Sequence, residues 1–109
     1  MKRLRSIAVL LTLAGCKGPT QSADGAKLFN ETCARCHAPD GHGDPTAKRT
    51  LGVPDMHDPV WQARLTDDDI RRTVREGSTS KKMPPFGTFY SKVQLDALVA
   101  HVRGFRRAR

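Results

Sequence analysis

Three cysteines, Cys16, Cys33 and Cys36, constrain the fold of this 109-residue chain more than any other feature. Their number is odd, so intramolecular disulfides cannot use all three thiols. The chain is long enough for one domain at most. Hydrophobic residues make up 38% of it and aromatic residues 6%, which is a thin core for a domain of this size. Small domains of this kind are usually reinforced by disulfides, a metal or a cofactor, and the cysteines are expected to hold such a group.

Two of the cysteines lie in the pentad Cys33-Ala34-Arg35-Cys36-His37. Cys-x-x-Cys-His is the spacing of c-type haem attachment. Two cysteines on one helical turn can form thioethers with both vinyl groups along one haem edge, and the adjacent histidine is then presented to the iron. The pentad therefore predicts one covalent haem c, bound by Cys33 and Cys36, with His37 as an axial iron ligand.

Three other uses of the pentad compete with haem attachment. A thioredoxin-like redox pair normally opens a helix after a strand, whereas residues 24–32 are typical of a helix that precedes the pentad. A structural zinc site needs two further soft ligands, and the sequence has no second cysteine pair. A disulfide between Cys33 and Cys36 would close a small strained loop and leave His37 without a role.

The N-terminal segment has the pattern of an exported lipoprotein. Three basic residues come first, and residues 7–13 form an apolar run far shorter than the ~20 residues that cross a membrane. Leu13-Ala14-Gly15-Cys16 resembles the lipobox of bacterial lipoproteins. The resemblance implies a signal peptide over residues 1–15, a lipid on Cys16 and a short tether over residues 16–22. An ordinary secretory signal with a chance cysteine is the alternative.

The net charge of the mature protein depends on whether the N-terminal segment is removed. The formal net charge of +8 would suit nucleic acid or anionic lipid, but three of the positive charges lie in the expected signal peptide. Their removal leaves +5 on the mature chain. Because the leader predicts a protein that faces the periplasm or the cell exterior, no nucleic-acid partner is expected.

Three helical patterns, with no convincing strand pattern, predict an all-α fold. The first helix is expected to begin near Ala23 and to run into the pentad. The second and third each begin with a capping box, formed by Thr66 with Asp69 and by Ser91 with Gln94. The third then carries an apolar stripe at helical spacing, made up of Leu95, Leu98, Val99 and Val102.

The remaining segments are expected to be irregular. Residues 38–64 and 78–90 are predicted to be long loops, which suit a small domain only if they wrap around a group such as a haem. The acidic run of Asp67, Asp68 and Asp69 falls in the first turn of a helix, where negative charge is favoured. We therefore expect solvated capping residues there and no metal site.

From Asp24 to Phe105 the chain resembles the class I c-type cytochromes. Gly25 and Phe29 resemble the family's contact between the first and last helices, and residues 95–102 resemble its closing helix. The resemblance implies a small fold with three main helices and long loops wrapped around one haem. His101 departs from the pattern because the family commonly has an aromatic residue there, which puts the usual ring packing against Gly25 and Phe29 in question. We expect His101 at a helix interface or on the surface, and not on the iron.

The second axial ligand is expected to be Met83. It lies in Lys82-Met83-Pro84-Pro85-Phe86-Gly87, which resembles the axial methionine loop of the family. The two prolines stiffen the chain and can hold a weak thioether ligand in place. Met56 is instead expected in the core. His42 and His57, in polar loops, are expected to be exposed.

Two residues are expected to contact the haem region without binding iron. Pro54 resembles the family proline whose carbonyl accepts a hydrogen bond from the axial histidine, which would orient His37. Trp61 resembles a position where an indole donates to a haem propionate, and covering apolar haem surface would use the ring equally well.

The resemblance implies an electron carrier and not an enzyme, with a haem iron that cycles between Fe(II) and Fe(III) and binds no substrate. A peroxidase-like haem enzyme or a haem gas sensor, the alternatives, would need a displaceable distal ligand where Met83 closes the site. Redox proteins, acidic ones or a membrane oxidase or reductase, are the expected partners. A basic rim beside the haem-binding loops would steer them, unless its members are simply solvated charges: Lys48, Arg49, Lys81 and Lys82.

Overall fold

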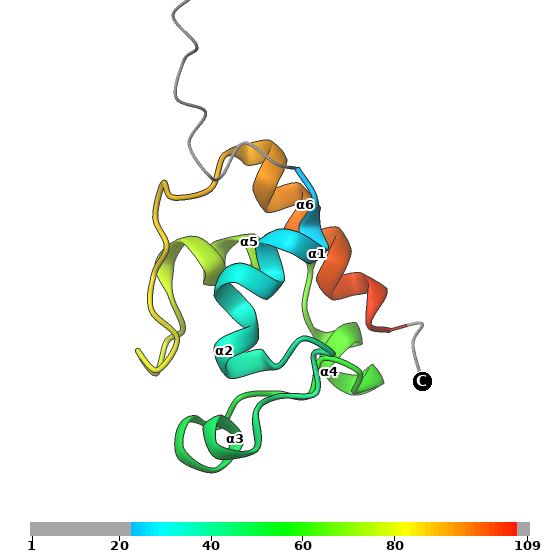
Figure 1. Ribbon diagram of the computed structural model, residues 1–109, viewed down its shortest axis with the longest axis vertical. Helices are drawn as coiled ribbons and strands as arrows, with labels where there is room; N and C mark the ends of the chain where they lie inside the picture. The colour runs from blue at the N-terminus through cyan, green and yellow to red at the C-terminus, as the bar shows by residue number, and fades with distance from the viewer. Residues whose placement is uncertain (1–22, 107–109) are drawn as a thin grey trace, which may run out of the picture.

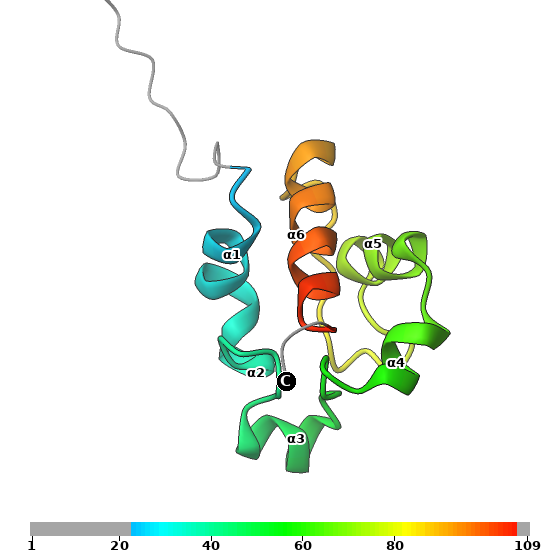
Figure 2. The ribbon, with the colours of Figure 1, turned by 90° about the vertical axis from the view of Figure 1, so that its right-hand side faces the viewer.

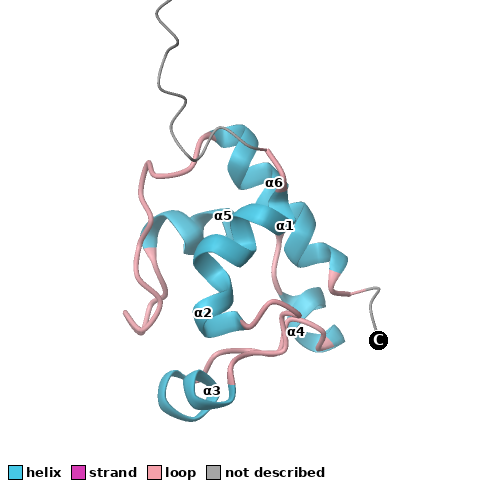
Figure 3. Ribbon diagram, in the orientation of Figure 1, coloured by secondary structure: helices cyan, strands magenta, loops and turns pink. Residues whose placement is uncertain are grey.

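The computed structural model describes residues 23–106. The expected signal peptide and tether lie outside this range. Every regular element in the described range is helical, so the predicted all-α fold is confirmed (Figure 3). In chain order the elements are α1 (Gly25–Leu28), the π-helical segment η1 (Phe29–Cys33), α2 (Ala34–His37), α3 (Pro45–Leu51), α4 (Pro59–Arg64), α5 (Asp67–Glu76) and α6 (Lys92–Gly104).

The first three elements follow one another without a break and carry the chain through the pentad (Figure 1). The segment begins after Asp24, whose carboxylate accepts a hydrogen bond from the amide of Lys27 at 3.2 Å. The expected first helix is therefore confirmed, with its start at Gly25 and not at Ala23. It ends at His37, and the next residue, Ala38, has a φ of 59° that turns the backbone out of the helix.

Both predicted capping boxes are formed. At the start of α5, the amide of Asp69 donates to Thr66 Oγ1 at 3.0 Å, and the amide of Thr66 donates to Asp69 Oδ2 at 2.9 Å. At the start of α6, Ser91 and Gln94 exchange the same two bonds, at 3.2 and 2.9 Å. These reciprocal bonds satisfy amides that a helix start otherwise leaves without partners.

The prediction of a long loop over residues 38–64 was wrong, because α3 and α4 lie within it. Each of these short helices begins with an Asp-Pro pair. Asp44 accepts a hydrogen bond from the amide of Ala47 at 3.0 Å, ahead of Pro45. Asp58 accepts one from the amide of Val60 at 2.9 Å, ahead of Pro59. An aspartate cap followed by a proline in the first helical position is a local helix-start signal, which the loop prediction left out.

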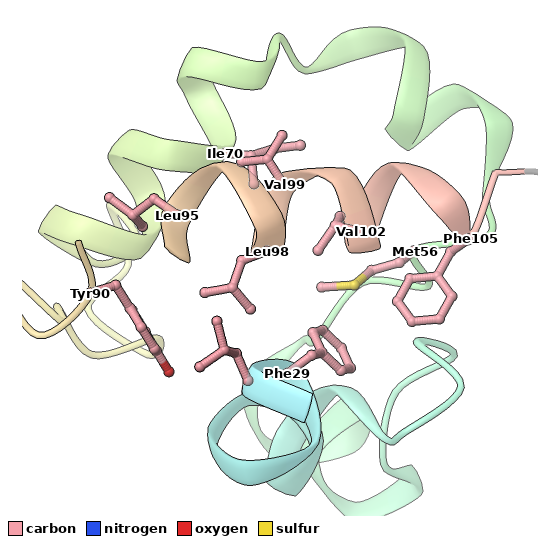
Figure 4. Close-up of a cluster of buried hydrophobic side chains, with 10 residues drawn as sticks. Phe29, Met56, Ile70, Tyr90, Leu95, Leu98, Val99, Val102 and Phe105 are labelled. Carbon is pink, nitrogen blue, oxygen red and sulfur yellow. The ribbon is translucent and has the colours of Figure 1, made fainter. Parts of the chain in front are cut away.

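The core lies where α1 and η1 pack against α6. Leu28 and Phe29 are each 1% exposed and belong to one core cluster with the predicted apolar stripe of α6. Figure 4 shows Phe29 facing that stripe. Figure 2 shows α1 and α6 side by side. Gly25 lies at this contact, where a Cβ atom would be only 2.2 Å from the carbonyl oxygen of Ala97. The backbones can therefore approach this closely only because residue 25 has no side chain.

A buried polar network ties α4 to α6. Gln62, 2% exposed, donates through Nε2 to the carbonyl oxygens of Met56 at 2.8 Å and Val102 at 2.9 Å. Arg103 donates to the carbonyl oxygen of Gln62 at 2.8 Å and to Asp67 Oδ1 at 2.8 Å. Because Val102 and Arg103 are about 40 residues away from Gln62 in the sequence, no local pattern signalled the network.

The expected capping role of the acidic run is confirmed at Asp69. Asp69 caps α5 and accepts a bond from Arg72, while Asp68 accepts one from Arg71. Within residues 23–106 no three His, Cys, Asp or Glu side chains are grouped in a way that could hold a metal ion.

Candidate haem-attachment site

The two cysteines of the pentad lie at the junction of η1 and α2. Cys33 is the last residue of η1, and Cys36 and His37 belong to the single turn of α2. Both thiols are free and half-buried, and Cys33 packs against the edge of the core. Three residues apart in helical backbone, they lie on one side of the helical segment, as attachment to one edge of a haem requires.

Burial raises the pKa of the Cys33 thiol to about 11, and the nearby Cys36 adds to the effect. At neutral pH Cys33 is therefore protonated. A protonated thiol reacts more slowly with oxidants than a thiolate does. This suits a cysteine that has to remain free until it forms a thioether.

His37 fits an iron ligand for two reasons. Burial lowers the pKa of its imidazole, which keeps the ring neutral, and neutral imidazole is the form that binds metals. Its Nδ1 atom is buried and has no hydrogen-bond partner among the described residues. The bond expected from His37 to the Pro54 carbonyl is thus not formed here, and the orienting role of Pro54 stays a prediction. The free thiols and the neutral, incompletely bonded imidazole together fit haem c.

Met83 lies in the loop that joins α5 to α6 (Figure 1). It is half-buried, and its backbone is bound to Ser78 on both sides. The amide of Ser78 donates to the Met83 carbonyl at 3.1 Å, and the Met83 amide donates to Ser78 Oγ at 3.0 Å. Beyond Met83, the amides of Phe86 and Gly87 donate to carbonyl oxygens in the last turns of α5, at 2.9 Å each. The loop is therefore fastened to the end of α5 before and after Met83.

The other candidate methionine, Met56, lies in the core as expected. Met56 is 6% exposed and lies in the core beside Phe105 (Figure 4). Its amide donates to the carbonyl of Gly41 at 2.9 Å, and its carbonyl accepts from Gln62. Met56 is thus fixed as a packing residue of the core.

His101 corrects one expectation and confirms another. The usual aromatic packing is present after all: the His101 ring lies 5.0 Å from that of Phe29 and 4.9 Å from that of Phe105, measured between centroids. Its Cβ would be 3.1 Å from a Cβ on Gly25. A flat imidazole can replace a phenyl ring in this position, and His101 is the expected helix-interface residue.

His42 is exposed as expected, but the expectation that His57 is exposed was wrong. The two rings stack 3.9 Å apart, and the His57 ring also packs against Phe105, at 5.2 Å. Stacking between these rings leaves His57 half-buried. His42 Nδ1 is also 3.0 Å from Asp55 Oδ1, so the pair is held in place.

Trp61 is half-buried and packs against the core cluster. This placement suits a ring that covers apolar surface, while donation to a propionate stays a prediction. The four members of the expected basic rim are all exposed: Lys48, Arg49, Lys81 and Lys82.

A small helical domain whose first helical segment ends in a haem-attachment pentad, and whose last helix crosses that segment at a glycine, is the architecture of a c-type cytochrome. Solved structures agree. The chain is 35% identical to the KustC0563 c-type cytochrome, with a TM-score of 0.66 over 75% of this chain and 96% of the other. A mutant of the same protein gives 36% identity and a TM-score of 0.65 over 76% of this chain and 99% of the other.

Residues 20–102 match the family described as cytochrome c oxidase, cbb3-type, subunit III, and the chain belongs to this family of class I c-type cytochromes. Membership implies haem c as the cofactor. The chain is 33% identical over 86 residues to the Cbb3-type cytochrome c oxidase subunit CcoP of Cereibacter sphaeroides, covering 76% of this chain and 27% of that protein. For CcoP of Azospirillum sp. the identity is 39% over 66 residues, covering 61% of this chain and 20% of that protein. The chain thus spans about a quarter of the length of these relatives.

Proposed function

We propose that this protein is an exported, lipid-anchored electron carrier with a single covalent haem c. Haem c, when bound, supplies a one-electron couple between Fe(II) and Fe(III). Cys33 and Cys36 would hold the haem by thioether bonds, and His37 and Met83 would be the ligands of its iron. A thioether ligand favours the ferrous state and raises the reduction potential.

One observation carries the proposal: the backbone of Met83 is fixed by hydrogen bonds to Ser78 in a loop fastened to α5. A weak ligand is retained when its loop is held in place, and a retained ligand leaves no free position for substrate or gas. This favours a carrier over a peroxidase-like enzyme or a gas sensor, both of which need a displaceable ligand.

We also propose a membrane oxidase or reductase as the class of redox partner. The relatives CcoP and FixP are named as subunits of a cbb3-type cytochrome c oxidase. The exposed basic rim would steer an acidic docking surface towards this domain.

Anchoring is proposed from the N-terminal sequence, with residues 1–15 as the signal peptide, Cys16 as the lipidated residue, residues 16–22 as the tether and residues 23–109 as the cytochrome domain. No helix in the described part of the chain is long and apolar enough to cross a membrane. The lipid would therefore place the carrier at the surface of a bacterial membrane, facing the periplasm or the exterior.

The proposal is tested by a reduced-minus-oxidised visible spectrum of the membrane-extracted protein, with and without carbon monoxide. A carrier with both axial positions filled should show the ferric sulfur-to-iron charge-transfer absorption and a ferrous spectrum that carbon monoxide leaves unchanged. Rapid carbon monoxide binding by the native ferrous protein would support the sensor or enzyme alternative instead.

A further inference from the structure

Ser78 contacts the Met83 loop through all three of its polar groups. Its amide donates to the Met83 carbonyl at 3.1 Å, and its own carbonyl accepts from the amide of Lys81 at 3.0 Å. Its Oγ accepts from the Met83 amide at 3.0 Å and lies 3.0 Å from Ser80 Oγ. In the described part of the chain, both backbone hydrogen bonds of Met83 end on this one residue.

The residue before Ser78 makes this approach possible. Gly77 has a φ of 80°, and a Cβ on it would lie 2.7 Å from the Met83 carbonyl oxygen and 3.0 Å from the Pro85 nitrogen. A side chain here would push the loop away from the end of α5. Gly77 and Ser78 therefore act together, the first by giving room and the second by binding.

The loop between Ser78 and Met83 contains a strained backbone conformation. Lys81 has a φ of 65°, a left-handed backbone conformation that residues other than glycine rarely adopt. Such a turn persists when surrounding bonds hold it. Ser78, which precedes the turn, is hydrogen-bonded to Lys81 within the turn and to Met83 after it, so these bonds hold the turn in place.

We propose that Ser78 is a positioning residue for Met83: its hydroxyl holds the Met83 backbone and so opposes displacement of the thioether by competing ligands. The inference rests on the proposed role of Met83 as the second axial ligand. The hydrogen bond between the Met83 amide and Ser78 Oγ resists any shift of the loop that carries the sulfur away from the iron. Displacement that moves the loop breaks this bond, so removing the hydroxyl makes that displacement easier.

Imidazole competition on the haem-loaded ferric protein measures the effect. Imidazole is titrated into the wild type and into Ser78→Ala, Ser78→Thr and Thr79→Ala while the sulfur-to-iron charge-transfer absorption is followed. One neutral hydrogen bond changes an equilibrium by a factor of about five, so the apparent Kd for imidazole should fall about fivefold in Ser78→Ala. Ser78→Thr retains a hydroxyl and should restore the wild-type value. Thr79 is exposed and makes no side-chain hydrogen bond in the described part of the chain, so Thr79→Ala should match the wild type.

Hydrogen exchange of the Met83 amide in the wild-type protein gives a readout that needs no variant. The amide should be protected relative to that of exposed Thr79, and Ser78→Ala should reduce this protection. An imidazole Kd unchanged in Ser78→Ala, an equal change in Thr79→Ala, or an unprotected Met83 amide in the wild type would each overturn the inference. If instead Met83→Ala retains the charge-transfer absorption, the proposed ligand itself is wrong, and the two failures are thus distinguishable.

Discussion

The imidazole of His101 packs against the phenyl ring of Phe29, with ring centroids 5.0 Å apart and ring planes inclined at 53°. Phe105 contacts the same imidazole, at 4.9 Å and 72°. Nε2 of His101 is buried and has no hydrogen-bond partner among the described residues. Burial lowers the pKa of His101 below its ordinary value of 6.5, and Asp24 opposes this only in part. The contact between the first and last helices therefore prefers a neutral ring.

This preference predicts a stability that depends on pH. The unfolded chain takes up a proton on His101 near pH 6.5, whereas the folded chain does so only at lower pH. Above pH 6.5 both states hold a neutral ring and nothing is lost. As the pH falls through 6.5 towards the folded pKa, the unfolded state binds more protons and folding stability decreases.

His101→Phe should remove this contribution, because phenylalanine packs in the same place without titrating. Thermal unfolding at about pH 7.5 and about pH 5 checks it, a range across which histidine changes charge. The fall in Tm on acidification should be smaller in the variant than in the wild type. His37, whose pKa is also lowered by burial, is present in both proteins and cancels in the comparison. An equal fall in the two proteins would mean that His101 does not titrate with folding.

Gly25→Ala should destabilise the fold. The new Cβ would lie 2.2 Å from the carbonyl oxygen of Ala97, and backbone atoms cannot rotate away from it as a flexible side chain could. Overpacking of this kind costs about 1–3 kcal/mol, more than the roughly 0.5–1 kcal/mol gained by replacing glycine with alanine in a helix. Denaturant unfolding measures the difference.

Gly104→Ala is the matched control for that substitution. Gly104 is the last residue of α6, and nothing lies within 4 Å of a Cβ added to it. Only the helix-propensity gain should remain there, so this variant should be slightly more stable than the wild type. Equal effects at the two glycines would contradict the close crossing of α1 and α6.

Met83→Ala should leave the haem attached, since Cys33, Cys36 and His37 are intact, but should open one iron position. Loss of the thioether removes its preference for ferrous iron, so the reduction potential should fall and carbon monoxide should bind the ferrous protein. Because Lys81 or Lys82 could enter the site and reduce carbon monoxide binding, the potential, measured by redox titration, is the safer observable.

Met56→Ala is the control for the ligand assignment. Met56 is 6% exposed in the core, so its truncation should cost about 2–5 kcal/mol of stability while leaving the iron ligands in place. If this variant, and not Met83→Ala, loses the charge-transfer absorption and the high potential, the two methionines have been assigned the wrong way round.

Cys16→Ser should release the domain from membranes. Two or three acyl chains bind a bilayer far more firmly than one, so the wild-type protein should stay in the membrane fraction after washing with salt. The serine variant has no thiol to acylate and should be recovered in the soluble fraction. Wild-type protein recovered wholly in the soluble fraction would show that the lipobox resemblance misled.

The sequence by itself determined the features that depend on neighbouring residues. The capping boxes of Thr66 with Asp69 and of Ser91 with Gln94 form as predicted, because each needs only residues within one helical turn. The starts of α3 and α4 could also have been predicted, since Asp44-Pro45 and Asp58-Pro59 are local helix-start signals that the sequence analysis did not use. The role of the pentad in haem attachment is a prediction of the same local kind, because it rests on spacing along one continuous helical segment.

Only the tertiary structure decided the contacts between residues distant along the chain. His101 packs where the family commonly has an aromatic residue, and this depended on the positions of Phe29 and Phe105. The contact of His57 with Phe105 depended on the tertiary structure in the same way. The network of Gln62 and Arg103 joins α4 to α6 through residues that no periodic pattern relates.

The hydrogen bonds between Ser78 and Met83 join residues that are closer in the sequence. They still form only because the loop folds back over Gly77. A serine hydroxyl can accept a hydrogen bond from any of several nearby amides, and the backbone conformation determines which amide is its partner.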